Sequence, residues 1–135
     1  MEKKSEYQIL SSVNEGIPEI IITGNATGSD FSMMLKEVDI ILKTYGAKKA
    51  IFDIRALDGR IESTEIYRFV RNNNFLIYGG ESAIVDLPEN ALFGTAVKDA
   101  GLPWKWFTDI DAARKWIKNS KREMVSNLNE KDVNI

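Results

Sequence analysis

The stretch AIFDIRALDGRIESTEIYRF, residues 50–69, predicts a strand, a loop and the start of a helix in direct succession. Its first part belongs to the segment KKAIFDI, which is expected to form a strand with Ile51, Phe52 and Ile54 as its apolar core. RALDGR follows, and its Asp58-Gly59 pair is typical of a turn. A strand that leads into a helix through a short polar loop is the repeating unit of α/β proteins, so this stretch decides the fold class.

The helix is expected to begin near Glu62-Ser63-Thr64. The apolar residues that it turns inward are Ile66, Phe69 and Val70. A serine at a helix start has two compatible roles. It can cap the first turn, and as a phosphoacceptor it would place a phosphate beside free N–H groups and a favourable helix dipole. We therefore take Ser63, followed by Thr64, as the phosphoacceptor candidates.

Toward the N-terminus the sequence predicts two strands joined as a hairpin. Apolar and polar residues alternate over 7–13, which is typical of a half-exposed edge strand. NEGIP supplies a turn, and EIIITG follows with Ile20, Ile21 and Ile22 in a row. Such a continuous run indicates a strand buried on both sheet faces between helices. The two strands are close enough in sequence to pair as an antiparallel hairpin.

The clearest helix covers 31–45, with Ser29 or Asp30 as its cap and Gly46 as its C-cap. Its inward face comprises Phe31, Met34, Leu35, Val38, Ile41, Leu42 and Tyr45, whereas Lys36, Glu37, Asp39 and Lys43 lie off that face.

Three further elements complete the order. SAIVDL is a strand, and a helix follows from Pro88 with the inward stripe Leu92, Phe93, Ala96, Val97 and Ala100. WKWF at 104–107 is the fifth strand, and TDID at 108–111 fits a capping box. The inward stripe of the last helix is Ile110, Ala113, Trp116 and Ile117. A hairpin and four β-α units thus predict a mixed, mostly parallel five-stranded sheet in one domain over 6–119. Residues 120–135 are expected to form a polar C-terminal helix extension or tail.

Composition narrows the chemistry of the 135-residue chain. It has no cysteine and no histidine, which excludes disulfides, thiol nucleophiles, zinc-thiolate sites and imidazole catalysis. Lys and Arg total 18 against 20 Asp and Glu, so no basic field points to nucleic acid. The charged start is unlike a signal peptide, and no apolar run is long enough for a membrane span. We expect a cytoplasmic binding or regulatory protein without enzymatic activity, cofactor or metal.

Two loop features have alternative interpretations. TGNATGS at 23–29 lies between a strand and a helix, where anions bind, but it lacks the lysine of a phosphate-binding loop and is interpreted as a turn with a cap. Four acids follow strands: Asp53, Asp58, Asp86 and Asp109. Ligands bind at that edge of an open sheet, so an enzyme using Asp53 or Asp58 with a metal is one hypothesis, although loop and capping roles are more common for Asp.

The aromatic strand and the last helix also have two interpretations each. Trp104 and Trp106 share one strand face, and we expect them in the core under the last helix with Trp116, with an apolar ligand cleft as the alternative. The last helix carries a basic stripe, Arg114, Lys115, Lys118, Lys121 and Arg122, which is interpreted as a solvated face, with nucleic acid or anionic lipid as the alternative.

The hairpin and the four β-α units resemble the SpoIIAA-like fold, which includes the STAS domains of anti-sigma-factor antagonists. AIFDIRAL…IESTEIYRF at 50–69 is similar to the strand, loop and helix of those antagonists, and an ungapped match lays Ser63 on their phosphoacceptor. Their signature there is Asp-Ser-Ser-Gly, whereas this chain has Ile61-Glu62-Ser63-Thr64. The segment SAIVD…WKWFTDIDAARKWI at 82–117 resembles the C-terminal half of stand-alone SpoIIAA-like proteins.

The resemblance implies a STAS-like regulatory module that binds a protein partner, either an anti-sigma factor or a kinase-like protein, and that phosphorylation of the serine can switch. The surface expected to meet the partner or ligand comprises Asn25, Asp58, Arg60, Glu62, Trp104 and Trp106. A small apolar ligand or lipid, held near the tryptophans and Met33 and Met34, is the alternative that the same resemblance implies. The sequence leaves the oligomeric state open.

Overall fold

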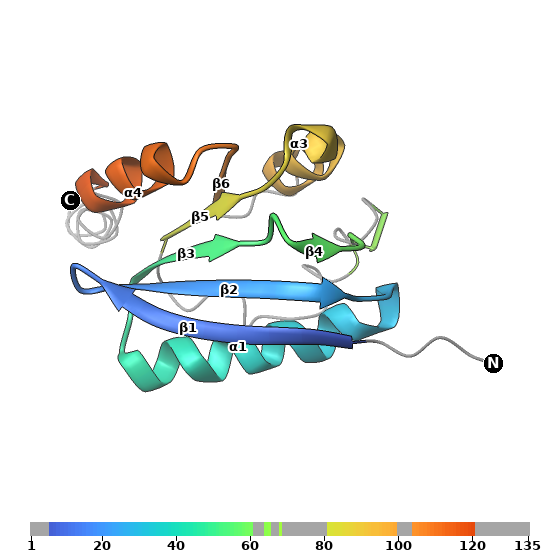
Figure 1. Ribbon diagram of the computed structural model, residues 1–135, viewed down its shortest axis with the longest axis horizontal. Helices are drawn as coiled ribbons and strands as arrows, with labels where there is room; N and C mark the ends of the chain where they lie inside the picture. Colours follow the sequence, from blue (N-terminus) through green and yellow to red (C-terminus); the bar gives the residue numbers. More distant parts are fainter. Residues whose placement is uncertain (1–5, 61–63, 66–67, 69–80, 100–103, 121–135) are drawn as a thin grey trace, which may run out of the picture.

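The computed structural model describes residues 6–60, 64–65, 68, 81–99 and 104–120. Their core is a mixed sheet in the order β1-β2-β3-β5-β6, with the short β4 beside β2 (Figure 1). The strands are β1 (Glu6–Asn14), β2 (Ile17–Asn25), β3 (Lys49–Asp53), β4 (Leu57–Asp58), β5 (Glu81–Val85) and β6 (Trp104–Phe107). The helices are α1 (Phe31–Tyr45), α3 (Ala91–Asp99) and α4 (Ile110–Asn119), the first two preceded by the 3₁₀ turns η1 (Gly28–Asp30) and η2 (Pro88–Asn90).

The predicted N-terminal hairpin is confirmed. β1 and β2 pair antiparallel along their whole length, from Glu6 opposite Asn25 to Asn14 opposite Ile17. Glu15 and Gly16 connect them with φ angles of 54° and 82°, the left-handed pair that a two-residue hairpin turn requires. All other strand pairs in the sheet are parallel, as the alternation of strands and helices predicts.

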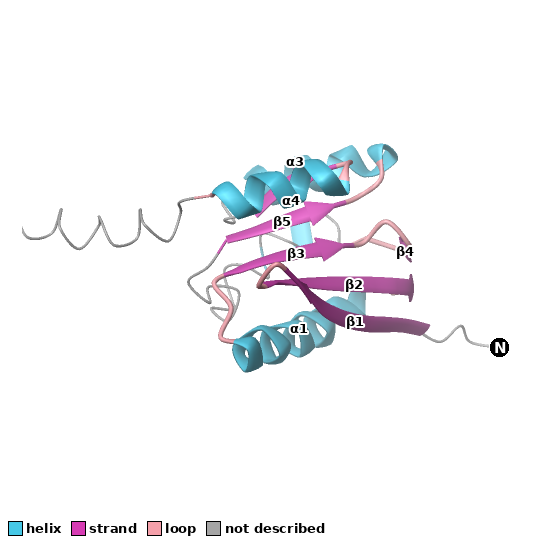
Figure 2. Cartoon of the chain, turned by 60° about the vertical axis from the view of Figure 1, so that its left-hand side comes forward, coloured by secondary structure: helices cyan, strands magenta, loops and turns pink. Residues whose placement is uncertain are grey.

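Helices cover the two sheet faces unequally. One core cluster lies between the sheet and helices α1 and α3, and it includes Ile20, Leu42, Phe52 and Val97. A smaller cluster under α4 consists of Ile51, Ala83, Val85, Ala113 and Ile117. Figure 2 shows α1 beside β1 and β2, and α4 beside β5. On the face opposite α1, α4 reaches β2 near Ile17 and Glu19, whereas the cluster under α4 includes no described residue of β1.

That uneven cover corrects the expectation for the isoleucine run in β2. Ile20 and Ile22, on the α1 face, are 0% and 4% exposed, whereas Ile21 is only half-buried. The prediction of burial on both faces was therefore wrong for Ile21, because α4 packs chiefly over β3 and β5 and meets β2 near Glu19, before Ile21. Local sequence shows that a strand is apolar on both sides, but not how far each covering helix extends.

Helix α1 ends as predicted and begins after a 3₁₀ turn. Gly46 is its left-handed C-cap, with a φ of 65°. The N-cap of α1 is Asp30, one of the two predicted residues, but its side chain makes no capping hydrogen bond to α1. Its carboxylate instead accepts from the backbone N–H of Thr27 at 2.7 Å, in the 3₁₀ turn that precedes α1. Asp39, expected on the solvated side, is only 8% exposed and pairs with Lys43 at 2.9 Å, whereas Tyr45, expected inside, is 43% exposed.

The third predicted unit is found as β5, η2 and α3, with one correction. Pro88 opens the 3₁₀ turn and not the helix itself. The predicted inward stripe holds for Ala96 and Val97, but Leu92 is 86% exposed. The buried side of α3 instead includes Gly94, where Trp106 of β6 packs so closely that a Cβ would lie 2.7 Å from its ring.

Two loop predictions are also corrected. Leu57 and Asp58, expected in a plain loop, form β4 and pair with Gly24 and Asn25, which makes a sixth strand. Gly24 N and Ala26 N donate to the carbonyls of Ala56 and Asp58 at 3.1 and 3.0 Å, and these bonds hold β4 beside β2. The cap of α4 is Asp109, whose carboxylate accepts from Ala112 N, and not the first residue of TDID. Helix α4 ends at a C-cap on Ser120, and the rest of the predicted C-terminal extension, 121–135, lies outside the described residues.

Candidate functional site

A buried ion pair joins the end of β5 to the loop that follows β4. The Asp86 side chain is fully buried, and the Arg60 side chain is 12% exposed. Arg60 Nη2 donates to Asp86 Oδ1 at 2.6 Å, and Nε donates to Oδ2 at 3.3 Å. The other donors to this carboxylate are Leu87 N, Asn90 Nδ2 and Trp106 Nε1, at 2.7, 2.9 and 3.3 Å. The pair therefore holds together residues that are far apart in the sequence.

Arg60 also closes the loop in which it lies. Its guanidinium donates to the carbonyl oxygens of Ile54, Leu57 and Gly59 at 2.8, 2.6 and 2.6 Å. The same group lies 5.9 Å from the centre of the Phe93 ring, within the range of a cation–π contact. Only the five-donor fork of arginine can serve three carbonyls and a carboxylate at once. Arg60 thus fixes the chain between β3 and residue 60.

The carboxylate of Asp86 stays ionised because of these donors. Burial alone favours its neutral form, but the hydrogen bonds from Arg60, Asn90 and Leu87 N together outweigh burial and hold the pKa of Asp86 below its usual value. The pKa of Asp53 is lowered in the same way, where burial is outweighed by bonds from Arg55. The pKa of Glu19 is lowered mainly by its hydrogen bond from Arg114.

Acid is therefore expected to destabilise the fold. A carboxyl whose folded-state pKa lies below its unfolded-state value stabilises the fold above about pH 4 and loses that contribution as the pH falls further. In urea unfolding between pH 6 and pH 2.5, wild-type stability should fall steeply at the acid end. Asp86→Asn should be less stable than wild type at pH 6, and the two curves should converge toward low pH. Parallel curves would show that Asp86 does not titrate in this range.

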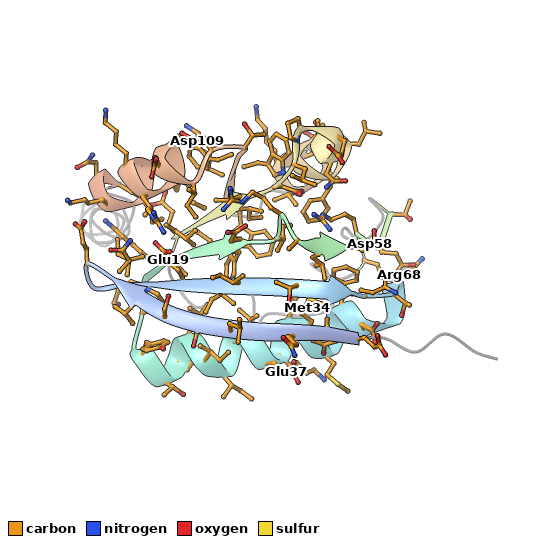
Figure 3. All side chains as sticks on the ribbon, viewed as in Figure 1. Glu19, Met34, Glu37, Asp58, Arg68 and Asp109 are labelled. Atoms are coloured by element: carbon orange, nitrogen blue, oxygen red, sulfur yellow. The ribbon has the colours of Figure 1, made fainter. Side chains whose placement is uncertain are left out.

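Asn25 and Asp58 lie next to the ion pair and are adjacent in the β2–β4 ladder. Asp58 is exposed and Asn25 half-buried. Figure 3 places Asp58 and Arg68 at the same end of the molecule, far from Glu19. The predicted surface residues Asn25, Asp58 and Arg60 thus come together at the carboxyl end of β2, although the Arg60 guanidinium turns inward.

The predicted phosphoacceptor segment is described in part. Thr64, Glu65 and Arg68 have helical geometry and are exposed, and Arg68 pairs with Glu65 at 3.2 Å. Ser63 and Glu62 lie outside the described residues, as do the predicted inward residues Ile66, Phe69 and Val70. Exposed residues with helical geometry are therefore present from Thr64, four residues after the anchored Arg60.

The two tryptophans of β6 lie on one sheet face, as predicted, but not under the helix that was predicted. Both pack against the cluster beneath α1 and α3, whereas Phe107 of β6 and Trp116 of α4 pack against the smaller cluster between α4 and the sheet. Trp104 lies 6.3 Å from the Phe52 ring, and its buried Nε1 has no hydrogen-bond partner among the described residues. The two indoles therefore fill the core, and only Trp106 reaches the candidate site, through Asp86.

The residues of the apolar-ligand and metal hypotheses are not brought together. Met34 is 2% exposed and Met33 is 62% exposed, so the two methionines face different sides of α1. Asp53 pairs with Arg55 at 2.8 Å, and Asp109 caps α4. Within the described ranges, no three acidic side chains gather as metal ligands would. None of the helices in these ranges is long and apolar enough to cross a membrane.

A second buried ion pair, which the sequence analysis did not predict, joins α4 to β2. Arg114 donates to both carboxylate oxygens of Glu19 at 2.8 and 2.9 Å, and Glu19 is 5% exposed. An open pocket of about 320 Å³ borders this pair and is also lined by Ile17, Ile51 and Lys118. Lys118 pairs with Glu15 at 2.8 Å. Two of the basic residues predicted to form a solvated stripe are thus paired with acids of the hairpin.

Arg60 and Asp86 were each noted in the sequence, one as a surface residue and the other as a loop acid. An acid directly after the apolar run AIV, as in SAIVD, was the signal available for Asp86. Nothing local connects it to an arginine 26 residues earlier. The partnership depends on β3 and β5 being neighbours in the sheet.

Comparison with known proteins supports the fold. No protein-family model and no curated protein sequence matches the chain. Among solved structures, it is similar to an anti-sigma factor antagonist from Mycobacterium paratuberculosis, with a TM-score of 0.60 and 10% identity over 88% of this chain and 100% of the other. It is also similar to an uncharacterised protein with a SpoIIAA-like fold from Shewanella loihica, with a TM-score of 0.53 and 19% identity over 87% and 98%. The protein therefore has the SpoIIAA-like fold that its sequence predicts.

Proposed function

We propose that this protein is a cytoplasmic, non-enzymatic regulatory module. It binds a protein partner through the surface at the carboxyl end of β2, and phosphorylation of Ser63 weakens that binding. The likeness in fold to an anti-sigma factor antagonist supports the class of function. The single observation that carries the proposal is the anchoring of Arg60 by Asp86, with an exposed helical Thr64 four residues further on.

Anchoring matters because binding through a loose loop costs the entropy of ordering it. Arg60 ties three carbonyls of its own loop to the end of β5, so the segment up to residue 60 is already in place before a partner arrives. Asp58 and Thr64 flank this anchor and are exposed. The surface thus offers a partner a fixed backbone with polar side chains on it.

A phosphate at Ser63 would act on the partner and not on the fold. Arg60 is the nearest arginine in sequence, but its guanidinium is engaged with Asp86 and with backbone carbonyls. The exposed neighbours Asp58 and Glu65 are both acidic. A phosphate adds nearly two negative charges to this surface, so a partner that fits the unmodified form would meet strong repulsion.

The test is direct binding to purified anti-sigma-factor kinases from the organism that encodes the chain. At least one should bind, and Ser63→Asp should weaken binding by about tenfold or more, or about 1.4 kcal/mol. Ser32→Asp, an exposed serine in the first turn of α1, is the matched control and should bind as wild type does. The melting temperatures of all three proteins should agree within a few degrees, because surface substitutions of this kind change stability by about 0.5 kcal/mol.

Incubation with the binding kinase, ATP and Mg²⁺ should add one phosphate to the wild type, measured as intact mass. Ser63→Ala should remain unmodified. A phosphate that persists in Ser63→Ala and disappears in Thr64→Ala would move the switch to Thr64. Equal binding of wild type and Ser63→Asp would refute the switch, and no binding to any such kinase would refute the proposed partner class.

A further inference from the structure

Strand β1 is an edge of the sheet that the described strands form. It pairs with β2 alone among the described strands. Its sequence, EYQILSSVN, contains neither lysine nor proline, and its one charged residue is Glu6 at the end. Proteins usually protect long edge strands with such residues or with a bulge, because open N–H and C=O groups recruit further strands. A nine-residue edge without that protection is suited to pairing.

Exposed apolar side chains gather around this edge. Among the described residues, the exposed large hydrophobics are Leu10, Val13, Met33, Ile40, Tyr45 and Leu92, and of these only Leu92 lies away from β1 and α1. Leu10 and Val13 lie on β1 itself, and the Tyr45 hydroxyl lies 3.2 Å from that of Ser11. Met33 and Ile40 are seven residues apart on α1, on the side that also carries Glu37, whose carboxylate accepts from the Tyr7 hydroxyl (Figure 3).

The direction of the backbone groups follows from the hairpin. In a two-residue hairpin the closing pair, Asn14 and Ile17, is hydrogen-bonded, so alternate residues of β1 bond to β2. Gly24 supports this register, because its N–H donates to the Ala56 carbonyl on the other side of β2. The Gly24 N–H therefore does not donate to its β1 partner Tyr7. The residues whose N–H and C=O groups point outward are therefore Tyr7, Ile9, Ser11 and Val13.

We propose that β1 pairs antiparallel with β1 of a second copy of this chain, around a two-fold axis through Leu10, to form one continuous sheet. In this register Tyr7 lies opposite Val13 of the second copy, and Ile9 lies opposite Ser11. Every outward-pointing group of both strands is then used, in on the order of eight hydrogen bonds. The two Leu10 side chains meet on the sheet face opposite α1, where Leu10 is 55% exposed.

The strand is self-complementary in charge as well as in shape. Antiparallel pairing about its central residue places Glu6 opposite Asn14 of the second copy, so no two like charges face each other. The N-terminal end of β1 lies beside Asn25, at the candidate site. The two candidate sites of the pair would therefore lie at opposite ends of the joint sheet, and both would remain open to partners.

The first test is the oligomeric state of the full chain by light scattering and sedimentation over a wide concentration range. Wild type should be a dimer, and Leu10→Lys, which places two cations at the axis, should raise the dimer dissociation constant at least tenfold. Leu92→Lys makes the same replacement at a more exposed leucine of α3 and should remain dimeric. Circular dichroism should be unchanged in both variants. A monomeric wild type, or a dimer equally stable in Leu10→Lys, overturns the proposal.

The second test measures the register. The chain has no cysteine, so a single introduced thiol can bond only to its copy. At the axis the two Leu10 residues form a non-hydrogen-bonded pair with Cα atoms about 4.5 Å apart, within the range of about 4.4–6.8 Å that a disulfide allows. Leu10→Cys should give a covalent dimer under mild oxidation, far faster than Leu92→Cys. Equal rates for the two variants contradict the register.

Discussion

Replacing Arg60 with alanine is expected to lower the free energy of unfolding by about 3–5 kcal/mol, because the buried Asp86 carboxylate then loses its counter-ion. The carbonyls of Ile54, Leu57 and Gly59 lose a donor at the same time. In a domain of this size, such a loss corresponds to roughly 10 °C or more in melting temperature. Urea unfolding at pH 7 measures it directly.

A neighbouring pair supplies the matched control. Arg55 binds Asp53 through two hydrogen bonds at 2.9 and 2.8 Å, with the same residue types at the end of the adjacent strand β3. Its side chain, however, is 40% exposed, so Arg55→Ala should cost only about 1 kcal/mol or less. Equal effects of the two substitutions would show that burial does not decide the strength of the Arg60 pair.

The double replacement Arg60→Met with Asp86→Leu separates stability from positioning. Removing both charges avoids an uncompensated buried ion, so the double variant should be considerably more stable than Arg60→Ala. It should nevertheless bind the protein partner less well than wild type, because the loop carbonyls that Arg60 holds are released. Wild-type partner affinity in this variant would mean that the anchor serves the fold alone.

Replacing Gly59 with alanine is the second substitution with a large expected effect, about 3–4 kcal/mol of destabilisation from the left-handed alanine and from steric overlap together. Gly59 has a φ of 101°, and an added Cβ would lie 2.2 Å from the carbonyl oxygen of Ala26. That contact is with backbone next to the β2–β4 ladder, so relief requires β4 to separate from the Ala26 segment. Thermal and urea unfolding both measure the loss.

Gly16 separates the two contributions to this effect. It also has a positive φ, 82°, but an added Cβ there meets nothing within 4 Å. Gly16→Ala should therefore lower the free energy of unfolding only by the conformational cost of a left-handed alanine, about 1–2 kcal/mol. The difference between the two variants is the cost of the close approach at Ala26. A Gly59→Ala protein no less stable than Gly16→Ala would contradict the packing of β4 against that segment.

These substitutions concern the same short segment that carries the candidate site. Gly59 allows the chain to turn beside Ala26, and Arg60 then enters the interior to bind Asp86. The exposed Asp58 precedes that turn, and the helical Thr64 follows it. A tightly constrained backbone segment thus lies at the position where we propose that a partner binds.

The sequence by itself determined which elements form. The Glu15-Gly16 turn, the left-handed Gly46 and the apolar runs of β3 and β5 specify the hairpin, the end of α1 and the buried strands. Each of these signals acts over a few residues, because turn geometry, helix capping and apolar periodicity are local properties. The order of elements that they define was enough to predict the SpoIIAA-like fold.

Only the tertiary structure decided what each side chain meets. It placed Trp106 under α3 and not α4, left Leu92 exposed, and paired Arg60 with Asp86 from 26 residues away. These outcomes depend on which strands become neighbours and on which face each helix packs. The same local pattern allows a crossover helix to lie on either face of the sheet. The long-range pairing alone therefore distinguishes a surface arginine from the anchor of the candidate site.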